Sequence, residues 1–230
     1  MQTLVHCDLS YRMVRRAGGP RLVADEEALP FAAASFDLVI SLLNLHWVND
    51  LPGALLQIRR ALKPDGLFLA AMFGGETLKE LRRSLAEAEI AGEGGLSPRI
   101  SPFADVRDAG NLLQRAGFAL PLADVETLTV FYADPFALLA DLRGMGETNA
   151  VRERRKTASR RATLFRAAER YRQIYGNADG RVPATFQVVF LTAWAPDASQ
   201  PKPLRPGSAS SRLAEALGTE EIPAGDRARP

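Results

Sequence analysis

The amino-acid sequence predicts an α/β fold built around a parallel β-sheet. Two continuous apolar runs, at residues 36–41 and 67–73, are typical of strands that are buried on both faces of such a sheet. A helical pattern lies between them, so strand, helix and strand alternate as in a right-handed crossover unit. Two shorter β-favouring runs precede them, and each ends at a carboxylate, Asp8 or Asp25.

The elements of the first half follow from local signals. Residues 3–7 and 22–24 are the two short strands that end at the carboxylates. The helix between the long apolar runs begins after Asp50, which can cap it, with Pro52 in its first turn. Apolar residues at helical spacing continue from there until Pro64 ends the pattern.

The second half is predicted to be richer in helix. Thr77 and Glu80 have the spacing of a capping box, which predicts a helix whose apolar face runs to Ala88 and which ends before Gly92. The remaining elements are expected in this order: a helix at 105–116 stopped by Gly117, a strand at 125–132, helices at 135–143 and 160–175, and a strand at 184–194.

Composition predicts one main domain with an appendage. With 230 residues, 47% of them hydrophobic, the chain is long enough to bury a substantial core. We expect one α/β domain over residues 1–195. Proline, serine, glycine and charge dominate residues 196–230, which predicts a mobile C-terminal tail with a short helix at 211–217.

Several classes of protein are disfavoured by the sequence. No apolar run approaches the roughly 20 residues of a transmembrane helix, so no transmembrane segment is expected. The first residues lack the pattern of a secretory leader, and the cytoplasm is therefore the expected location. Cys7 is the only cysteine and His6 and His46 are the only histidines, so a metal site is not predicted.

Asp8 and Asp25 are the residues with the clearest chemical implication. Ligands of an open parallel sheet bind beyond the carboxyl ends of its strands, where both side chains are expected. One carboxylate there can accept both hydroxyls of a ribose, and the next can accept the exocyclic amine of adenine. The alternative is that each aspartate simply begins a turn or caps a helix.

The sequence around Asp25 resembles a pattern of small-molecule methyltransferases that use S-adenosylmethionine (SAM). An acidic residue is followed by Leu29-Pro30-Phe31 and then by Ser35-Phe36-Asp37 and an apolar strand. The resemblance implies a cofactor site in which Asp8 holds the ribose, Asp25 and Glu26 the adenine side, and Ser41, Leu42 and Leu43 the floor beneath the sulfonium. It places His46 and Trp47 at the catalytic, substrate-facing side.

These two catalytic candidates have alternative interpretations. His46 could act as a base, or its side chain could orient the loop before Trp47 by hydrogen bonding. Trp47 could simply pack, as most buried tryptophans do.

A second resemblance covers residues 8 to about 218. The strings LHWVNDLPGAL, KPDGLFLAAMFGGETLKELR, DLRGMGETNA and DGRVPATFQ look like those of bacterial relatives of mitochondrial complex I assembly factor 5. The resemblance implies a Rossmann-like class I methyltransferase sheet with helical insertions. It also implies SAM-dependent methyl transfer to a small molecule or to a protein arginine during respiratory complex I assembly. The mitochondrial member is instead regarded as hydroxylating an arginine of a complex I subunit, a reaction for which the two histidines of this chain offer no evident iron site. The alternative is a non-catalytic assembly protein that has lost SAM binding.

The front of the chain departs from this family. Its members begin with a strand and a D-x-G-x-G type loop that holds the methionine part of SAM, and only seven residues precede Asp8. Gly18-Gly19 follows Asp8 and is better explained as a turn. We therefore expect an N-terminally truncated sheet with exposed apolar strand edges, weaker cofactor binding, and a natural start upstream of Met1.

A basic segment offers a candidate partner surface. Residues 151–172 contain nine basic and two acidic side chains. A solvated helix face is the simpler explanation, and docking to an acidic protein surface or to membrane headgroups is the functional one. Nucleic acid is not expected, because aromatic residues are not interleaved through the segment and the net charge is only +2.

Overall fold

The computed structural model describes residues 3–201, 208 and 211–220. The chain divides into two compact units, Met1–Asp197 and Ala198–Pro230. The second unit contains helix α7 (Leu213–Leu217), close to where a short helix was predicted. Much of the predicted tail, residues 202–207, 209–210 and 221–230, lies outside the described residues.

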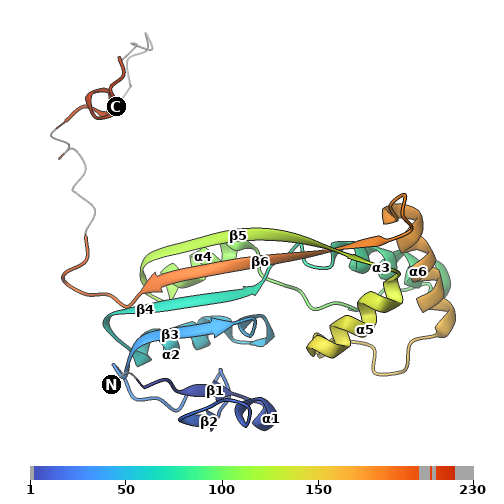
Figure 1. The fold of residues 1–230 in the computed structure, drawn as a ribbon, viewed down its shortest axis with the longest axis horizontal. Helices are drawn as coiled ribbons and strands as arrows, with labels where there is room; N and C mark the ends of the chain where they lie inside the picture. Colours follow the sequence, from blue (N-terminus) through green and yellow to red (C-terminus); the bar gives the residue numbers. More distant parts are fainter. Residues whose placement is uncertain (1–2, 202–207, 209–210, 221–230) are drawn as a thin grey trace. The chain divides into compact units, whose positions relative to one another are not determined.

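Among the described residues, the strands of the first unit form two sheets (Figure 1). The smaller sheet pairs β1 (His6–Asp8) with β2 (Arg21–Val23) in parallel. The larger sheet contains four strands in the spatial order β3 (Phe36–Leu42), β4 (Leu62–Phe73), β6 (Val182–Trp194) and β5 (Ala119–Tyr132).

The larger sheet is mixed. β3 and β4 run parallel, as predicted for the first half of the chain. β6 runs antiparallel to both of its neighbours, β4 and β5. The chain thus has an α/β fold in which only the first half of the sheet follows the parallel pattern.

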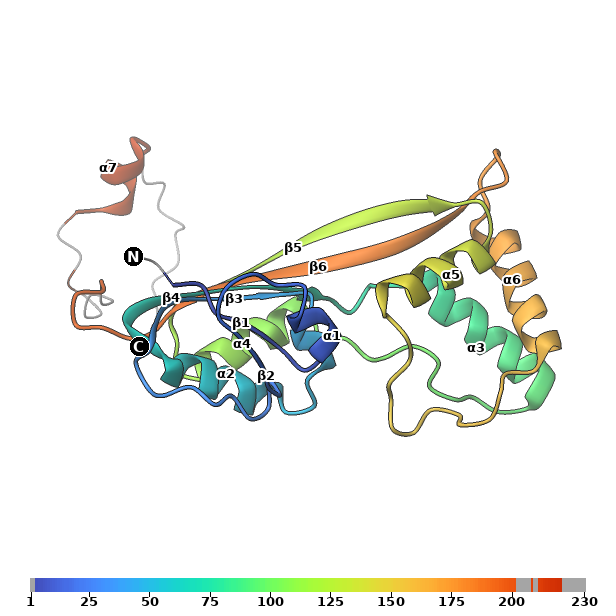
Figure 2. The same ribbon diagram turned by 60° about the horizontal axis from the view of Figure 1, so that its bottom comes forward.

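The helices gather in two groups, which Figure 2 separates. Helices α2 (Leu51–Ala61) and α4 (Val106–Arg115) pack with β4 and β6 around one buried apolar cluster. Helices α3 (Lys79–Glu93), α5 (Pro135–Met145) and α6 (Arg161–Tyr175) enclose a second cluster at the far end of the β5–β6 ribbon. Two short helices, α1 (Tyr11–Val14) and the 3-10 turn η1 (Leu45–Trp47), follow β1 and β3 and were not predicted.

Helix starts that depend on local signals are confirmed. Asp50 caps α2, since its Oδ1 accepts a hydrogen bond from the amide of Gly53 at 2.9 Å. Asp105 caps α4 in the same way. Gly117 follows α4 with a φ of +78°, the left-handed conformation that glycine adopts without strain.

The predicted capping box at Thr77 is wrong. The hydroxyl of Thr77 donates to the carbonyl of Gln187 at 3.0 Å and accepts from its amide at 3.1 Å. Glu80 instead accepts hydrogen bonds from the amide and the hydroxyl of Thr185. Because both side chains are buried and serve strand β6, they are not available to the first turn of α3, where Leu78 takes the cap position.

Two predicted strands are too short. β4 begins at Leu62 and not at Leu67, because Leu62 already pairs with Phe36 before a bulge shifts the register. β5 begins at Ala119, because its pairing with β6 extends well beyond the β-favouring run at 125–132.

The outer edge of β3 has no strand partner within the described part of the chain. β1 and β2 lie in their own sheet, so the strand ending at Asp8 does not pair with the strand that contains Ser41. Leu38, Ile40 and Leu42 are 44, 53 and 71% exposed. The predicted exposure of apolar side chains along this strand is confirmed.

Candidate functional site

The structure places Asp8 and Asp25 at the same end of the β1–β2 pair. Asp8 is the last residue of β1, and the parallel register sets it opposite Val23, two residues before Asp25. The amide of Ala24 donates to the carbonyl of Asp8 at 3.3 Å. The two acidic side chains therefore share the carboxyl edge at which open sheets bind ligands.

Each aspartate also forms the turn that the alternative interpretation predicted. Oδ1 of Asp8 accepts from the amide of Ser10 at 2.7 Å, and Oδ1 of Asp25 accepts from the amide of Glu27 at 2.9 Å. The turns fix the direction of both side chains. Within the described residues, the second oxygen of each carboxylate has no hydrogen bond or ion pair, so a ligand could still bind there.

The loop after β2 is tied to the end of β3. Oε1 of Glu26 accepts a hydrogen bond from Nδ2 of Asn44 at 2.5 Å. Oε1 of Glu27 accepts from the amides of Asn49 at 2.6 Å and Asp50 at 3.3 Å, and these backbone hydrogen bonds lower the pKa of the Glu27 carboxyl. The ends of β1, β2 and β3 therefore form one connected edge, which we call the strand rim. The anchoring role of Glu27 was not predicted.

Ser41, Leu42 and Leu43 lie at the carboxyl end of β3, on the strand rim. Leu42 is 71% and Leu43 45% exposed, so this part of the rim offers apolar surface. Leu43 has a φ of +50°, which costs energy for a residue with a side chain. Its amide donates to the carbonyl of Ala71 at 2.7 Å, which holds the strained turn against β4.

Just past the strand rim, η1 brings His46 and Trp47 to a cavity of about 370 Å³. The cavity extends from η1 to α3, to the segment 99–103, to α5 and to the loop that follows α5. Sequence reasoning identified only His46 and Trp47. The lining also includes Leu78, Leu81, Leu85, Arg99, Leu139, Leu142, Arg143, Glu147, Arg154 and Arg155.

His46 is an enclosed polar group of this cavity. Its side chain is 1% exposed, and its ring contacts those of Phe73 and Phe103 at centroid distances of 4.8 and 5.8 Å. Nε2 lies 3.2 Å from Oε1 of Glu147, while Nδ1 is buried without a hydrogen-bond partner in the described structure. A buried polar atom without a partner is unusual. The contact with Glu147 connects η1 to the loop after α5, so the alternative role of His46, orienting the loop before Trp47 by hydrogen bonding, stays a prediction.

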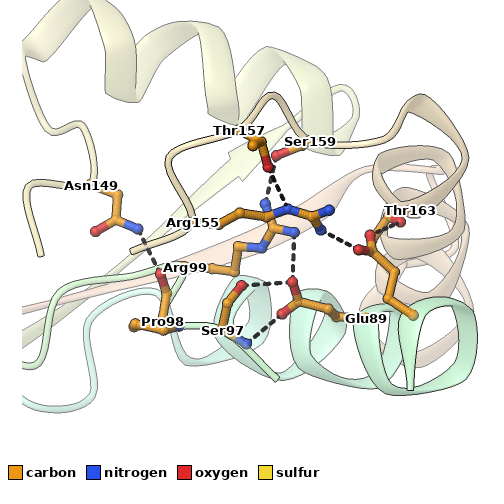
Figure 3. A network of polar contacts seen from close by, with 10 residues as sticks. Glu89, Ser97, Pro98, Arg99, Asn149, Arg155, Thr157, Ser159 and Thr163 are labelled. Atoms are coloured by element: carbon orange, nitrogen blue, oxygen red, sulfur yellow. Dashed lines mark hydrogen bonds and ion pairs between the residues drawn. The ribbon is translucent and has the colours of Figure 1, made fainter. Parts of the chain in front are cut away.

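A network of buried polar contacts braces the cavity wall (Figure 3). Nη2 of Arg99 lies 2.7 Å from Oε1 of Glu89, and Nη1 donates to the hydroxyl of Ser159 at 2.5 Å. Arg155 pairs with Glu93. These contacts connect α3 to the segments on both sides of the cavity.

The basic segment is partly neutralised by the molecule itself. Arg155 and Arg170 form ion pairs with Glu93 and Glu87 of α3. The other basic side chains of residues 151–172 have no ion pair in the described part of the chain. This arrangement is compatible with both interpretations of the segment.

A second hollow, of about 590 Å³, lies elsewhere. Its lining includes Ala33, Arg59, Arg60 and Pro64, close to the start of β3 and β4. It is therefore at the opposite end of the parallel strands from the strand rim.

The described residues lack two kinds of feature. They contain no group of three or more His, Cys, Asp or Glu side chains placed to hold a metal ion. No helix among them is both long and apolar enough to cross a membrane.

Comparison with known proteins finds a matching family model and two groups of relatives. Residues 1–70 match the family model described as a methyltransferase domain. The chain is 50% identical over 194 residues to arginine-hydroxylase NDUFAF5, mitochondrial, of Danio rerio, a match covering 84% of this chain and 60% of that protein. The Homo sapiens protein of the same name is 52% identical, with coverage of 84 and 56%.

A second group of relatives has a different name. A malonyl-[acyl-carrier protein] O-methyltransferase of Halorhodospira halophila is 42% identical over 176 residues, covering 76% of this chain and 58% of that protein. The chain thus spans about 60% of the length of the curated relatives that it matches.

Solved structures support the fold. The YcgJ protein of Bacillus subtilis superposes with a TM-score of 0.56 at 14% identity, covering 86% of this chain and 84% of that one. The BH2331 protein of Bacillus halodurans superposes with a TM-score of 0.53 at 13% identity, with coverage of 85 and 84%. The chain therefore has the Rossmann-like fold of class I methyltransferases.

Proposed function

We propose that this chain, a relative of the SAM-dependent methyltransferases, binds SAM at the strand rim and transfers its methyl group. The observation that supports this most directly is the placement of Asp8 and Asp25 at one end of two hydrogen-bonded parallel strands. In this proposal Asp8 accepts the ribose hydroxyls, and Asp25 and Glu26 face the adenine.

The residues of the strand rim fit such a cofactor. Asp8 and Asp25 each keep one carboxylate oxygen that is not used by the turn, and Leu42 and Leu43 leave apolar surface exposed beside them. SAM is an activated methyl donor, so it would supply the electrophile. The protein would mainly align the acceptor and exclude water.

The acceptor would enter through the cavity beyond η1. His46 and Trp47 line that cavity and follow β3 in the chain, a few residues after the Ser41–Leu43 stretch proposed for the sulfonium. His46 could accept a proton from the acceptor through its unpartnered Nδ1, because histidine is the usual group for this work near neutral pH.

The names of the relatives suggest two acceptor classes. We propose either a protein arginine, on a respiratory complex I subunit that docks on residues 151–172, or a small molecule. We propose the cytoplasm as the location. The alternative, an assembly protein that binds a partner but no SAM, is an outcome of the test below.

Ligand-observed saturation-transfer NMR with SAM tests the proposal, because it detects even millimolar binding. Asp8→Asn and Asp25→Asn should each weaken binding about tenfold or more, since hydrogen bonds to a charged group contribute roughly 1.5 to 3 kcal/mol. Asp37→Asn is the matched control. Asp37 is an exposed carboxylate at the start of β3, paired with Lys63 and far from the strand rim.

Two outcomes would contradict the proposal. One is that the unaltered chain shows no saturation transfer to SAM, which would favour the assembly protein. The other is that Asp37→Asn weakens binding as much as Asp8→Asn does, which would place the site elsewhere.

A further inference from the structure

The cavity beyond η1 has a closed end and an open end. At the closed end the His46 side chain is 1% exposed. At the open end Arg143, on α5, and Arg154, in the loop after α5, are both exposed. A ligand that fills the cavity would therefore meet the histidine with one end and the arginines with the other.

The two arginines of the open end are not neutralised by the protein. Arg99 and Arg155, which also line the cavity, pair with Glu89 and Glu93. In the described structure neither Arg143 nor Arg154 has a carboxylate partner. Nη1 of Arg154 donates only to the carbonyl of Val151, at 3.0 Å, which holds the side chain within its own loop.

Apolar side chains form another part of the cavity lining. They come from α3 and α5 and are Leu78, Leu81, Leu85, Leu139 and Leu142. The volume of about 370 Å³ lies within the range of about 300 to 1,000 Å³ that is usual for small-molecule pockets.

We propose that this cavity binds an amphipathic carboxylate. The carboxylate binds Arg143 and Arg154, the apolar body packs along the leucines of α3 and α5, and the opposite end reaches His46. The proposal that the cavity binds such a ligand depends only on these residues and not on methyl transfer. That this ligand is also the methyl acceptor rests on the proposed function. If the ligand is the acceptor, the acceptor is a small anionic molecule and not an arginine side chain.

Charge is the reason for preferring an anion to a guanidinium. Glu147 is the only carboxylate among the residues of this lining, and its Oε1 already contacts His46. A cation would therefore find one carboxylate, already in contact with His46, and two arginines without a carboxylate partner in the described structure. Arginine is the residue best suited to binding a carboxylate, because its planar fork donates two parallel hydrogen bonds.

Three probes of equal chain length test the proposal without any cofactor: octanoate, octylguanidinium and 1-octanol. Binding to the full chain can be followed by tryptophan fluorescence, because Trp47 lines the cavity, and by calorimetric titration. Octanoate should bind most tightly. The double variant R143Q/R154Q should weaken octanoate binding about tenfold, equivalent to about 1.4 kcal/mol, and leave 1-octanol unaffected.

The double variant R152Q/R172Q is the matched control. It removes the same charge from exposed arginines of the basic segment that do not line the cavity. Its octanoate affinity should equal that of the unaltered chain. Circular dichroism checks that both double variants fold, which their exposed positions favour.

Three results would overturn the proposal. They are tighter binding of octylguanidinium than of octanoate, equal loss of octanoate binding in both double variants, and no binding of any probe. None of them bears on SAM, whose binding is tested separately at Asp8 and Asp25. A chain that binds octanoate but not SAM would refute the proposed function and leave this site standing.

Discussion

Replacing Glu89 by glutamine is expected to destabilise the fold substantially, because Glu89 is the buried anion of the network in Figure 3. The residue is 3% exposed. It accepts hydrogen bonds from the Ser97 amide at 2.8 Å, the Ser97 hydroxyl at 2.6 Å and Nη2 of Arg99 at 2.7 Å. The change keeps the shape of the side chain and removes its charge.

The size of the effect follows from these contacts. A hydrogen bond to a charged group contributes roughly 1.5 to 3 kcal/mol, and removing one partner of a buried ion pair costs about 3 to 5 kcal/mol. Glutamine retains one acceptor oxygen, so we expect a loss at the lower end, about 3 kcal/mol in the free energy of unfolding.

The effect should depend on pH. Burial raises the pKa of Glu89, but hydrogen bonds from Ser97 and Arg99 outweigh it, so the pKa lies below its usual range. The contribution of ionised Glu89 to the free energy of unfolding is therefore complete above its pKa in the unfolded chain, about 4.3. It is lost as the pH falls through its lower pKa in the folded protein. The difference between the two proteins should shrink in acid.

Urea denaturation at pH 7 and at pH 3.5 measures both parts of this prediction. The control is Arg83→Gln, which breaks an exposed ion pair with Glu87 on the same helix and should change stability far less. Adding Arg99→Met to Glu89→Gln should recover stability, because no buried charge is then left unpaired. A loss in Glu89→Gln no larger than that in Arg83→Gln would refute the reasoning.

Three further predictions concern single contacts. Asp50→Ala removes the cap that accepts from Gly53 and should cost about 1 kcal/mol by urea denaturation; an unchanged midpoint would contradict it. Tyr171→Phe removes a buried hydroxyl that donates to the Pro183 carbonyl at 2.7 Å, which should lower stability by roughly 1 to 3 kcal/mol. Ile40→Lys puts a charge on β3, which has no strand partner on its outer edge in the described structure, and should raise the concentration at which aggregation begins by light scattering, with little change in melting temperature.

The predictable part of the fold is the part specified by neighbouring residues. The start of α2 was found because Asp50, Pro52 and Gly53 are adjacent in sequence. Thr77 and Glu80 carry an equally good local signal, yet their side chains bond Gln187 and Thr185, more than 100 positions away. Tertiary hydrogen bonds of buried groups outweigh a cap worth about 1 kcal/mol.

The candidate site also contains residues that could be placed from the sequence and residues that could not. Asp8 and Asp25 could be placed at one edge from sequence, because parallel strands joined by a crossover end on the same side. Glu147 could not be assigned to His46, since their contact depends on where α5 lies relative to η1. The arginines of the cavity mouth were part of a recognisable motif or of the basic segment, but neither pattern indicates a cavity.

One leucine at the strand rim and one at the cavity have the left-handed backbone conformation, which is strained for a residue with a side chain. Leu43 ends the β3 turn with a φ of 50°, and Leu78 caps α3 with a φ of 56° and lines the cavity. Glycine would adopt either conformation without the strain of about 1 to 3 kcal/mol that such positions cost other residues. Leu78 is 6% exposed, so its burial offsets the strain. Leu43 is 45% exposed and has less such compensation. The hydrogen bond from its amide to the carbonyl of Ala71, at 2.7 Å, is the contact that holds this strained turn in place.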